Sequence, residues 1–267
     1  MKKASQAILT GAAGGLLGGL MGVGGGIILV PMMVAFLKLS QHRAHGTSLA
    51  IIVPIALAGV IPYALSANAH WAVIAPLVAG TSAGVAIGAK WMMKISAKRL
   101  RQVFGVLLII VAVRMLFVSI PSHPPEGGLL GDGWVVLTLV GLGLGLFAGG
   151  IAGLMGVGGG IVIVPGLVLV LGFDQHTAQG VSLATIAATG IVGTVVNSRQ
   201  DNVDGKAAMA VIPSAVVFSL LGGYLANQIG GRALMIAFSC LPLLMSVKLL
   251  TQDLGKKAAK EKVEARG

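Results

Sequence analysis

Charged residues are scarce in this 267-residue chain. They make up 10% of the sequence, whereas hydrophobic residues make up 56%, and the mean hydropathy is +0.95. A soluble domain of this length needs a polar surface that such a composition does not supply, so the class of soluble globular proteins is excluded. The composition predicts an all-α polytopic membrane protein, because a hydrogen-bonded helix satisfies its own backbone in lipid.

Acidic residues are the rarest charged groups. Eight Asp and Glu residues stand against 19 Lys and Arg, and no acid precedes Glu126. A pathway for cations normally carries carboxylates inside the membrane. Their shortage argues against cation transport and against a proton relay built on carboxylates. If transport is coupled to protons, histidines are the expected carriers, because their charge changes near neutral pH.

Groups that usually perform catalysis are also few. The chain has one cysteine, Cys240, in an apolar run, and one thiol forms neither an intrachain disulfide nor a cysteine metal site. Neither an activated nucleophile nor an acid–base pair stands out. We therefore predict no catalytic residue, no metal site and no cofactor. A membrane-bound enzyme is a distant alternative.

What the chain has in abundance is glycine, 41 residues in all. The nine-residue sequence GLMGVGGGI occurs at residues 19–27 and again at 153–161. The shift from Gly19 to Gly153 also aligns, without a gap, many residues that follow the motif, among them Pro31 with Pro165, Gln41-His42 with Gln175-His176, and Ser48 with Ser182. The chain is therefore predicted to contain two homologous halves.

Breaks in the apolar pattern divide the chain into four parts. Prolines and glycines interrupt the pattern between the halves, as is typical of a linker. We expect a first repeat at residues 1–120, an external linker at 121–133, a second repeat at 134–255 and a basic cytoplasmic tail at 256–267. The tail has no aromatic residues that would stack on bases, so we expect no nucleic-acid partner.

The positions of Lys and Arg predict the topology, because these residues collect on the cytoplasmic side. If each glycine-split segment crosses the membrane once, the basic residues divide almost evenly between the two faces. If it returns to the face it entered, only Arg114 and Arg232 fall outside. We therefore predict two inverted-topology repeats, each with a glycine-broken helical hairpin plus three transmembrane helices. Whether the hairpins are re-entrant or fully spanning stays open.

The glycine clusters are the main candidate site. As a helix, the stretch from Ile27 to Lys38 reaches only about 18 Å at about 1.5 Å per residue, short of the ~30 Å hydrocarbon core. The hairpin tip is thus expected at membrane depth, where helix N-termini with exposed peptide N–H groups bind anions. The candidate substrate-binding glycines are Gly22, Gly24, Gly25, Gly26, Gly156, Gly158, Gly159 and Gly160.

Close helix packing is the competing interpretation of glycine. We accept it for glycines spaced four residues apart, such as Gly11, Gly15 and Gly19 in the first half and Gly141, Gly145, Gly149 and Gly153 in the second. A consecutive cluster does not follow that spacing, so the anion cradle is favoured there.

Polar residues after the short helices are secondary candidates. Ser48 and Ser182 could offer hydroxyls to substrate oxygens, with hydrogen bonding between helices as the alternative. His42 and His176, with Gln41 and Gln175 beside them, are candidates for a gate or a proton-linked role. A histidine that bonds nearby backbone is the competing interpretation.

The two glycine–proline motifs, with the Gln-His-x-Ala-x-Gly-x-Ser-Leu-Ala stretches that follow, resemble the sulfite exporter TauE/SafE family over nearly the whole chain. The resemblance implies a transporter of sulfite, sulfoacetate or another organosulfonate in the bacterial inner membrane. The distribution of Lys and Arg predicts that both termini are cytoplasmic. Its expected partners are a small anionic substrate and the lipid bilayer, and a homodimer is left open. An anion channel is the nearest alternative function.

Overall fold

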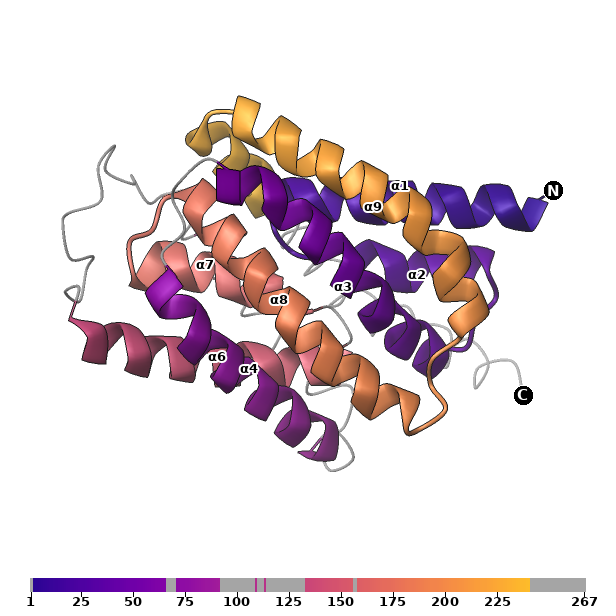
Figure 1. Cartoon of the computed structure of the whole chain (residues 1–267), viewed down its shortest axis with the longest axis horizontal. Coiled ribbons are helices and arrows are strands. Elements are labelled where there is room, and N and C mark those ends of the chain that lie inside the picture. Colours follow the sequence, from indigo (N-terminus) through magenta and orange to yellow (C-terminus); the bar gives the residue numbers. More distant parts are fainter. Residues whose placement is uncertain are drawn as a thin grey trace, which may run out of the picture.

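The computed structural model describes residues 2–65, 71–91, 109, 113, 133–155 and 158–240. Every regular element within these ranges is an α-helix (Figure 1). The labelled helices are α1 (Lys2–Met21), α2 (Gly26–Phe36), α3 (Gln41–Leu65), α4 (Trp71–Trp91), α6 (Trp134–Met155), α7 (Gly160–Val170), α8 (Gln175–Ser198) and α9 (Gly205–Gln228), and a shorter apolar helix covers Gly231–Cys240. The candidate Gly156, nearly all of the linker and the basic tail lie outside the described residues.

Five helices in the described ranges are long and apolar enough to cross a membrane. They are α1, α3, α6, α8 and α9, each with a span of 18 to 25 residues. Helices α2 and α7 have 11 residues each, which gives about 16 Å at about 1.5 Å per residue. The predicted polytopic, all-helical membrane protein and its two short helices are confirmed.

Helices from the two halves pack in exchanged pairs. Helix α1 packs along α9, α4 packs along α6, and α3 packs along α8. The sequence shift that relates the halves turns α1 into α6 and α9 into α4, so the first two pairs are copies of each other. Figure 1 shows these pairs along opposite edges, with α3 and α8 between them. Neither half can therefore bury its apolar faces without the other.

Glycines let the outer pairs approach at backbone distance. A methyl group on Gly15 of α1 would lie 2.8 Å from the carbonyl carbon of Ala215 in α9. One on Gly149 of α6 would lie 2.7 Å from the Cα atom of Thr81 in α4. Gly11, Gly19 and Gly145 are similarly close to the facing helix, and a methyl group on Gly141 would lie 3.2 Å from the Pro76 ring, so the packing prediction is confirmed for these six glycines.

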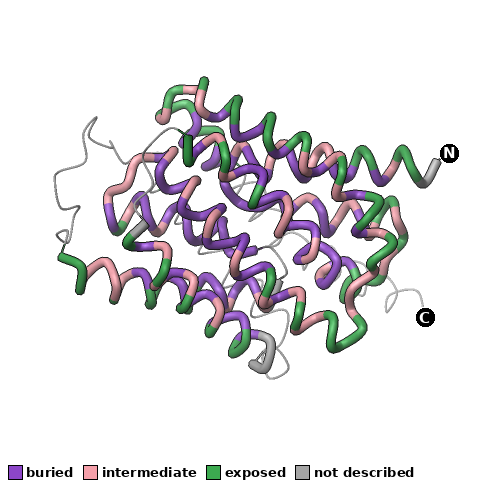
Figure 2. Tube along the Cα trace, viewed as in Figure 1, coloured by how far each residue is buried: buried purple, intermediate pink, exposed green. Residues whose placement is uncertain are grey.

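Burial increases from the edges to the centre of the bundle (Figure 2). In α8, 56% of the membrane-span residues are buried, against 28% in α6 and 33% in α9. The outer helices expose large apolar side chains such as Phe147 and Leu221, as expected where lipid is the solvent. Helix α8 is thus a central element, with protein on most of its surface.

Candidate functional site

Both glycine motifs break the chain where the sequence predicted. Helix α1 ends at Met21 and α2 begins at Gly26. Between them Gly22, Gly24 and Gly25 have φ values of 69°, 70° and 76°. Gly158 and Gly159 take φ values of 84° and 78° before α7. Residues with side chains rarely adopt this left-handed conformation, so the consecutive glycines are required by the backbone path.

The two turns meet at the centre of the molecule. We call residues 22–25 the first tip and the described residues 158–160 the second tip. A methyl group on Gly160 would lie 2.7 Å from the Cα atom of Val23 and 2.9 Å from the carbonyl oxygen of Gly22. The tips therefore touch backbone to backbone, and this contact joins the two halves.

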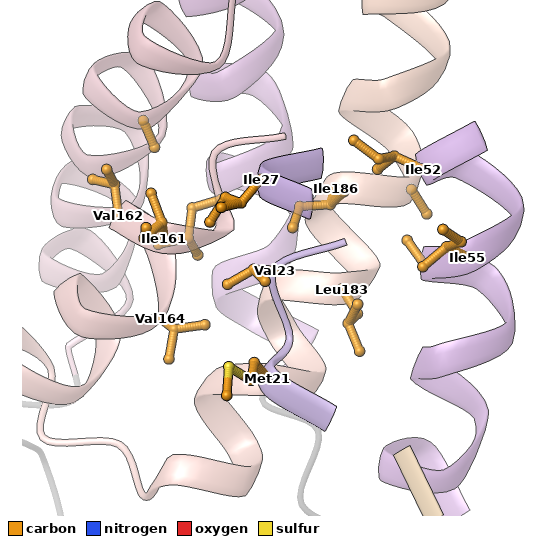
Figure 3. Close-up of a cluster of buried hydrophobic side chains, with 14 of the residues drawn as sticks. Met21, Val23, Ile27, Ile52, Ile55, Ile161, Val162, Val164, Leu183 and Ile186 are labelled. Carbon is orange, nitrogen blue, oxygen red and sulfur yellow. The ribbon is translucent and has the colours of Figure 1, made fainter. Parts of the chain in front are cut away.

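Apolar side chains enclose the contact between the tips. Ile52 of α3 and Ile186 of α8, which the shift aligns, both lie against Gly24 and Gly158. Figure 3 shows them with Val23 at the middle of the cluster. The surrounding side chains are buried, among them Ile27, Ile55, Ile161, Val162 and Leu183. Because the tips are surrounded by buried apolar side chains, partial charges on their peptide groups act through a lower dielectric than in bulk water.

Two helix N-termini begin at the tips. The N-cap residues of α2 and α7 are Gly25 and Gly159, and neither helix has a side-chain cap. The carbonyl of Gly25 accepts from the backbone N–H groups of Ile28 and Leu29, and that of Gly159 from those of Val162 and Ile163. Each N-terminus carries about half a positive charge. Uncapped helix N-termini of this kind attract anions.

A buried pair that the sequence analysis missed lies beside the first tip. The side chain of Gln179 in α8 rests on Gly22, with its Cβ atom 2.7 Å from the place of a methyl group there. Its Oε1 accepts a hydrogen bond of 3.0 Å from the hydroxyl of Tyr63 in α3. That hydroxyl also lies 2.9 Å from the Gly19 carbonyl oxygen at the end of α1. Gln179 follows the candidate Gln175 by four residues, about one helical turn. This spacing could have revealed it in the sequence.

The comparison with family models decides the family. The model for the sulfite exporter TauE/SafE matches residues 1–115 and 141–266. The chain belongs to the sulfite exporter TauE/SafE family. The family predicted from the glycine–proline motifs is therefore confirmed.

Relatives of this TauE/SafE protein are named as transporters. A "Probable membrane transporter protein" of Xylella fastidiosa is 31% identical over 227 residues, which cover 83% of this chain and 85% of the relative. The "Probable membrane transporter protein YunE" of Bacillus subtilis is 22% identical over 265 residues, with 92% and 97% covered. No solved structure matches. The protein is therefore a membrane transporter of this family.

The two candidate serines of the TauE/SafE protein are buried. Ser182 donates a hydrogen bond of 2.7 Å to the Gly22 carbonyl and so ties α8 to the first tip. Ser48 donates one of 2.7 Å to the His45 carbonyl one turn earlier in α3. Each hydroxyl proton is used within the protein in this conformation. A contact of either serine with the substrate stays a prediction. In this conformation Ser182 instead bonds a neighbouring segment of the chain.

The candidate gate residues lie in different surroundings. His42 and Gln41 are exposed, and the Gln41 amide lies 3.0 Å from His45 Nε2. His176 Nε2 lies 3.1 Å from the carbonyl oxygens of Ala226 and Ile229, where α9 ends. Gln175 is buried, and its amide has no hydrogen-bond partner. A gate or proton-linked role stays a prediction for all four.

Metal-binding groups do not gather in the described part of the chain. Within it, no group of three His, Cys, Asp or Glu residues could hold a metal ion. The chemistry that the site can perform rests on peptide N–H groups, amides and hydroxyls.

Proposed function

We propose that this protein transports small sulfur-containing anions, such as sulfite, sulfoacetate or another organosulfonate, across the bacterial inner membrane. The observation that carries the proposal is the convergence of two uncapped helix N-termini on one buried contact between the halves. Two such ends act together as about one positive charge without a lysine. The family description, sulfite exporter, supports the substrate class.

The proposed mechanism is alternating access at a midplane site between the tips. The touching tips and the isoleucines around them correspond to a closed arrangement. The anion enters when one tip withdraws and leaves when the other does. Each outer pair joins one helix from each half, so the proposed motion moves the α1–α9 pair and the α4–α6 pair relative to each other and keeps each pair together. Transporters built from inverted repeats bind their substrates at such interfaces.

The inverted topology has its own support and its own test. Helix α1 begins at one end of the molecule and α6 at the opposite end (Figure 1). With both termini in the cytoplasm, a reporter fused after Gly127 in the linker should be external. A cytoplasmic reading would overturn the inverted arrangement while leaving the helical assignments in place.

Uptake into proteoliposomes tests the function. Radiolabelled sulfite and sulfoacetate are offered to vesicles that hold the purified protein, with pH and sodium gradients imposed separately. Saturable uptake is expected, and its dependence on either gradient identifies the coupling ion. Empty vesicles are the control. Absence of uptake of both anions by folded, inserted protein would refute the substrate assignment.

The channel alternative shares the constriction but makes a different kinetic prediction. A channel would give flux that does not saturate and a measurable single-channel current. The closed contact between the tips favours a carrier, because a continuously open pore would not bury both tips.

A further inference from the structure

Five buried polar residues form a stripe along α8. They are Gln175, Gln179, Ser182, Thr185 and Thr189, and each is at most 5% exposed. Successive members are four, three, three and four positions apart, so at about 100° per residue they share roughly one third of the helix circumference. The stripe extends about 21 Å along the helix axis, at about 1.5 Å per residue. We call it the α8 polar stripe.

The first half of the chain has only part of such a stripe, on α3. The shift aligns the last two members of the stripe with Ile51 and Ile55 of α3, which are fully buried. It aligns Gln179 with His45. Polar groups therefore continue past the tips on α8 but not on α3. The sequence repeat alone would predict equal halves, so this asymmetry calls for a local reason.

All three hydroxyls in the α8 polar stripe have hydrogen-bond partners within the protein. Ser182 donates to the Gly22 carbonyl at 2.7 Å, and Thr185 donates to the Val181 carbonyl at 2.8 Å. The hydroxyl of Thr189 lies 2.6 Å from that of Thr81 in α4. A hydroxyl with its proton used in this way presents lone pairs and offers no donor to an anion.

The two glutamines are the exception. Gln179 is fully buried, and its Nε2 has no hydrogen-bond partner. Gln175, one turn earlier, is 2% exposed, and neither its nitrogen nor its oxygen has a partner. A buried amide without a hydrogen-bond partner lowers the stability of the folded state. Such groups are rare in native proteins and call for a specific explanation, such as a group that a ligand or water satisfies.

We propose that the Nε2 group of Gln179 is a side-chain donor to the transported anion beside the first tip, and that Gln175 continues this path toward the connection between α7 and α8. This inference rests on the proposed function. Gln179 contacts Gly22, so its amide lies next to the turn that leads into α2. Tyr63 acts as a positioning residue, since its hydroxyl holds Oε1 and leaves Nε2 for a ligand.

A neutral amide suits a carrier that must release its cargo. An amide N–H and uncapped peptide N–H groups bind an oxyanion through hydrogen bonds without a buried lysine or arginine, whose full charge would hold it more tightly. The donors come from both halves, with the tips contributing backbone and α8 contributing side chains. Movement of the tips apart would therefore change the number of donors that the anion contacts.

Two substitutions at Gln179 test the assignment in proteoliposomes with radiolabelled sulfite. Gln179→Met keeps the length of the side chain but removes the amide. It should raise KM by about 10- to 100-fold, the factor that one hydrogen bond to a charged group corresponds to. Gln228→Met, at an exposed position near the end of α9, is the matched control and should leave KM unchanged. A wild-type KM in Gln179→Met would overturn the inference.

Gln179→Glu separates a binding role from a packing role. An ionised carboxylate would repel the anion, whereas a protonated carboxyl restores a donor in nearly the same place. The ratio of variant to wild-type uptake should therefore rise as pH falls, with both proteins measured at each pH. A ratio near one at every pH would mean that this end of the Gln179 side chain accepts a hydrogen bond and does not donate one to the anion. The inference would then fail.

The two proteins also protect the test against misfolding. If Gln179→Met does not insert as a folded protein, the pH dependence of Gln179→Glu decides alone, since the change of its ratio to wild-type uptake with pH does not depend on how much of the variant is inserted. If the wild-type protein takes up neither sulfite nor sulfoacetate, the proposed function and this inference fail together. If the wild-type protein transports sulfite and both variants keep its KM, only the role of Gln179 fails.

Discussion

Gly25 and Gly159 occupy equivalent positions in the two motifs, yet the structure predicts unequal effects when each is replaced by alanine. Both have a left-handed backbone, with φ values of 76° and 78°, which costs an alanine about 1–2 kcal/mol. At Gly159 the new methyl group would lie 3.3 Å from the Ala148 carbonyl oxygen, a tight contact that a small shift relieves. Gly159→Ala should therefore lower stability by about 1–2 kcal/mol.

At Gly25 the methyl group would overlap the backbone carbonyl of Gly14 in α1. Backbone atoms cannot rotate away, so the first tip and α1 must separate. Overpacking of this kind adds roughly 1–3 kcal/mol. Gly25→Ala should therefore be less stable than Gly159→Ala by that amount, or by roughly 2–12 °C in apparent melting temperature at about 2–4 °C per kcal/mol.

Thermal unfolding of the detergent-purified variants measures this difference. Gly143→Ala is the control, since a methyl group there meets nothing within 4 Å and the helix should gain about 1 kcal/mol from the better helix former. Equal melting temperatures for Gly25→Ala and Gly159→Ala would refute the geometry of the first tip. Transport by the two variants should fall in the same order, and normal transport by both would refute the tip site.

Three further outcomes are expected. Tyr63→Phe should lower stability by about 1–3 kcal/mol, because it removes the one hydroxyl proton that the buried Gly19 carbonyl and the Gln179 amide oxygen share, and the thermal melt measures the loss. Asp174→Ala should cost about 1 kcal/mol, since its carboxylate caps α8 through two backbone N–H groups, whereas Asp174→Asn should melt near the wild-type temperature. Gly15→Leu should prevent α1 from packing on the α9 backbone and abolish the folded peak in size-exclusion chromatography, whereas Gly143→Leu should retain it.

Several features were predictable because they depend on local or compositional physics. Membrane residence follows from composition, since hydrocarbon solvates apolar side chains and excludes charges. The breaks near Gly22 and Gly158 follow from runs of glycine that no helix favours. The packing role of Gly11 and Gly15 follows from their four-residue spacing, which places them on one face of α1. The family follows from the same motifs, which recur in both halves.

Contacts between distant segments were not predictable. The sequence repeat aligns the two halves but does not say that α1 packs on α9 of the other half, because partner choice depends on surfaces that only the folded chain brings together. The same holds for Ser182, whose bond to Gly22 spans 160 positions. The inverted arrangement, the linker position and the gate role of His42 and His176 stay predictions.

Gln179 shows most clearly the difference between features that are predictable from the sequence and features that depend on tertiary contacts. Its sequence neighbours predict an amphipathic face on a helix, but a glutamine in a helix is usually a solvated surface residue. Only the tertiary structure places it at full burial against the first tip, with one end of its amide held by Tyr63. The membrane environment, the helices, the glycine turns and the family could all be predicted from the sequence, since each follows from short-range pattern or composition. Which polar groups are buried together was not predictable, because burial depends on which surfaces of distant segments meet in the folded chain.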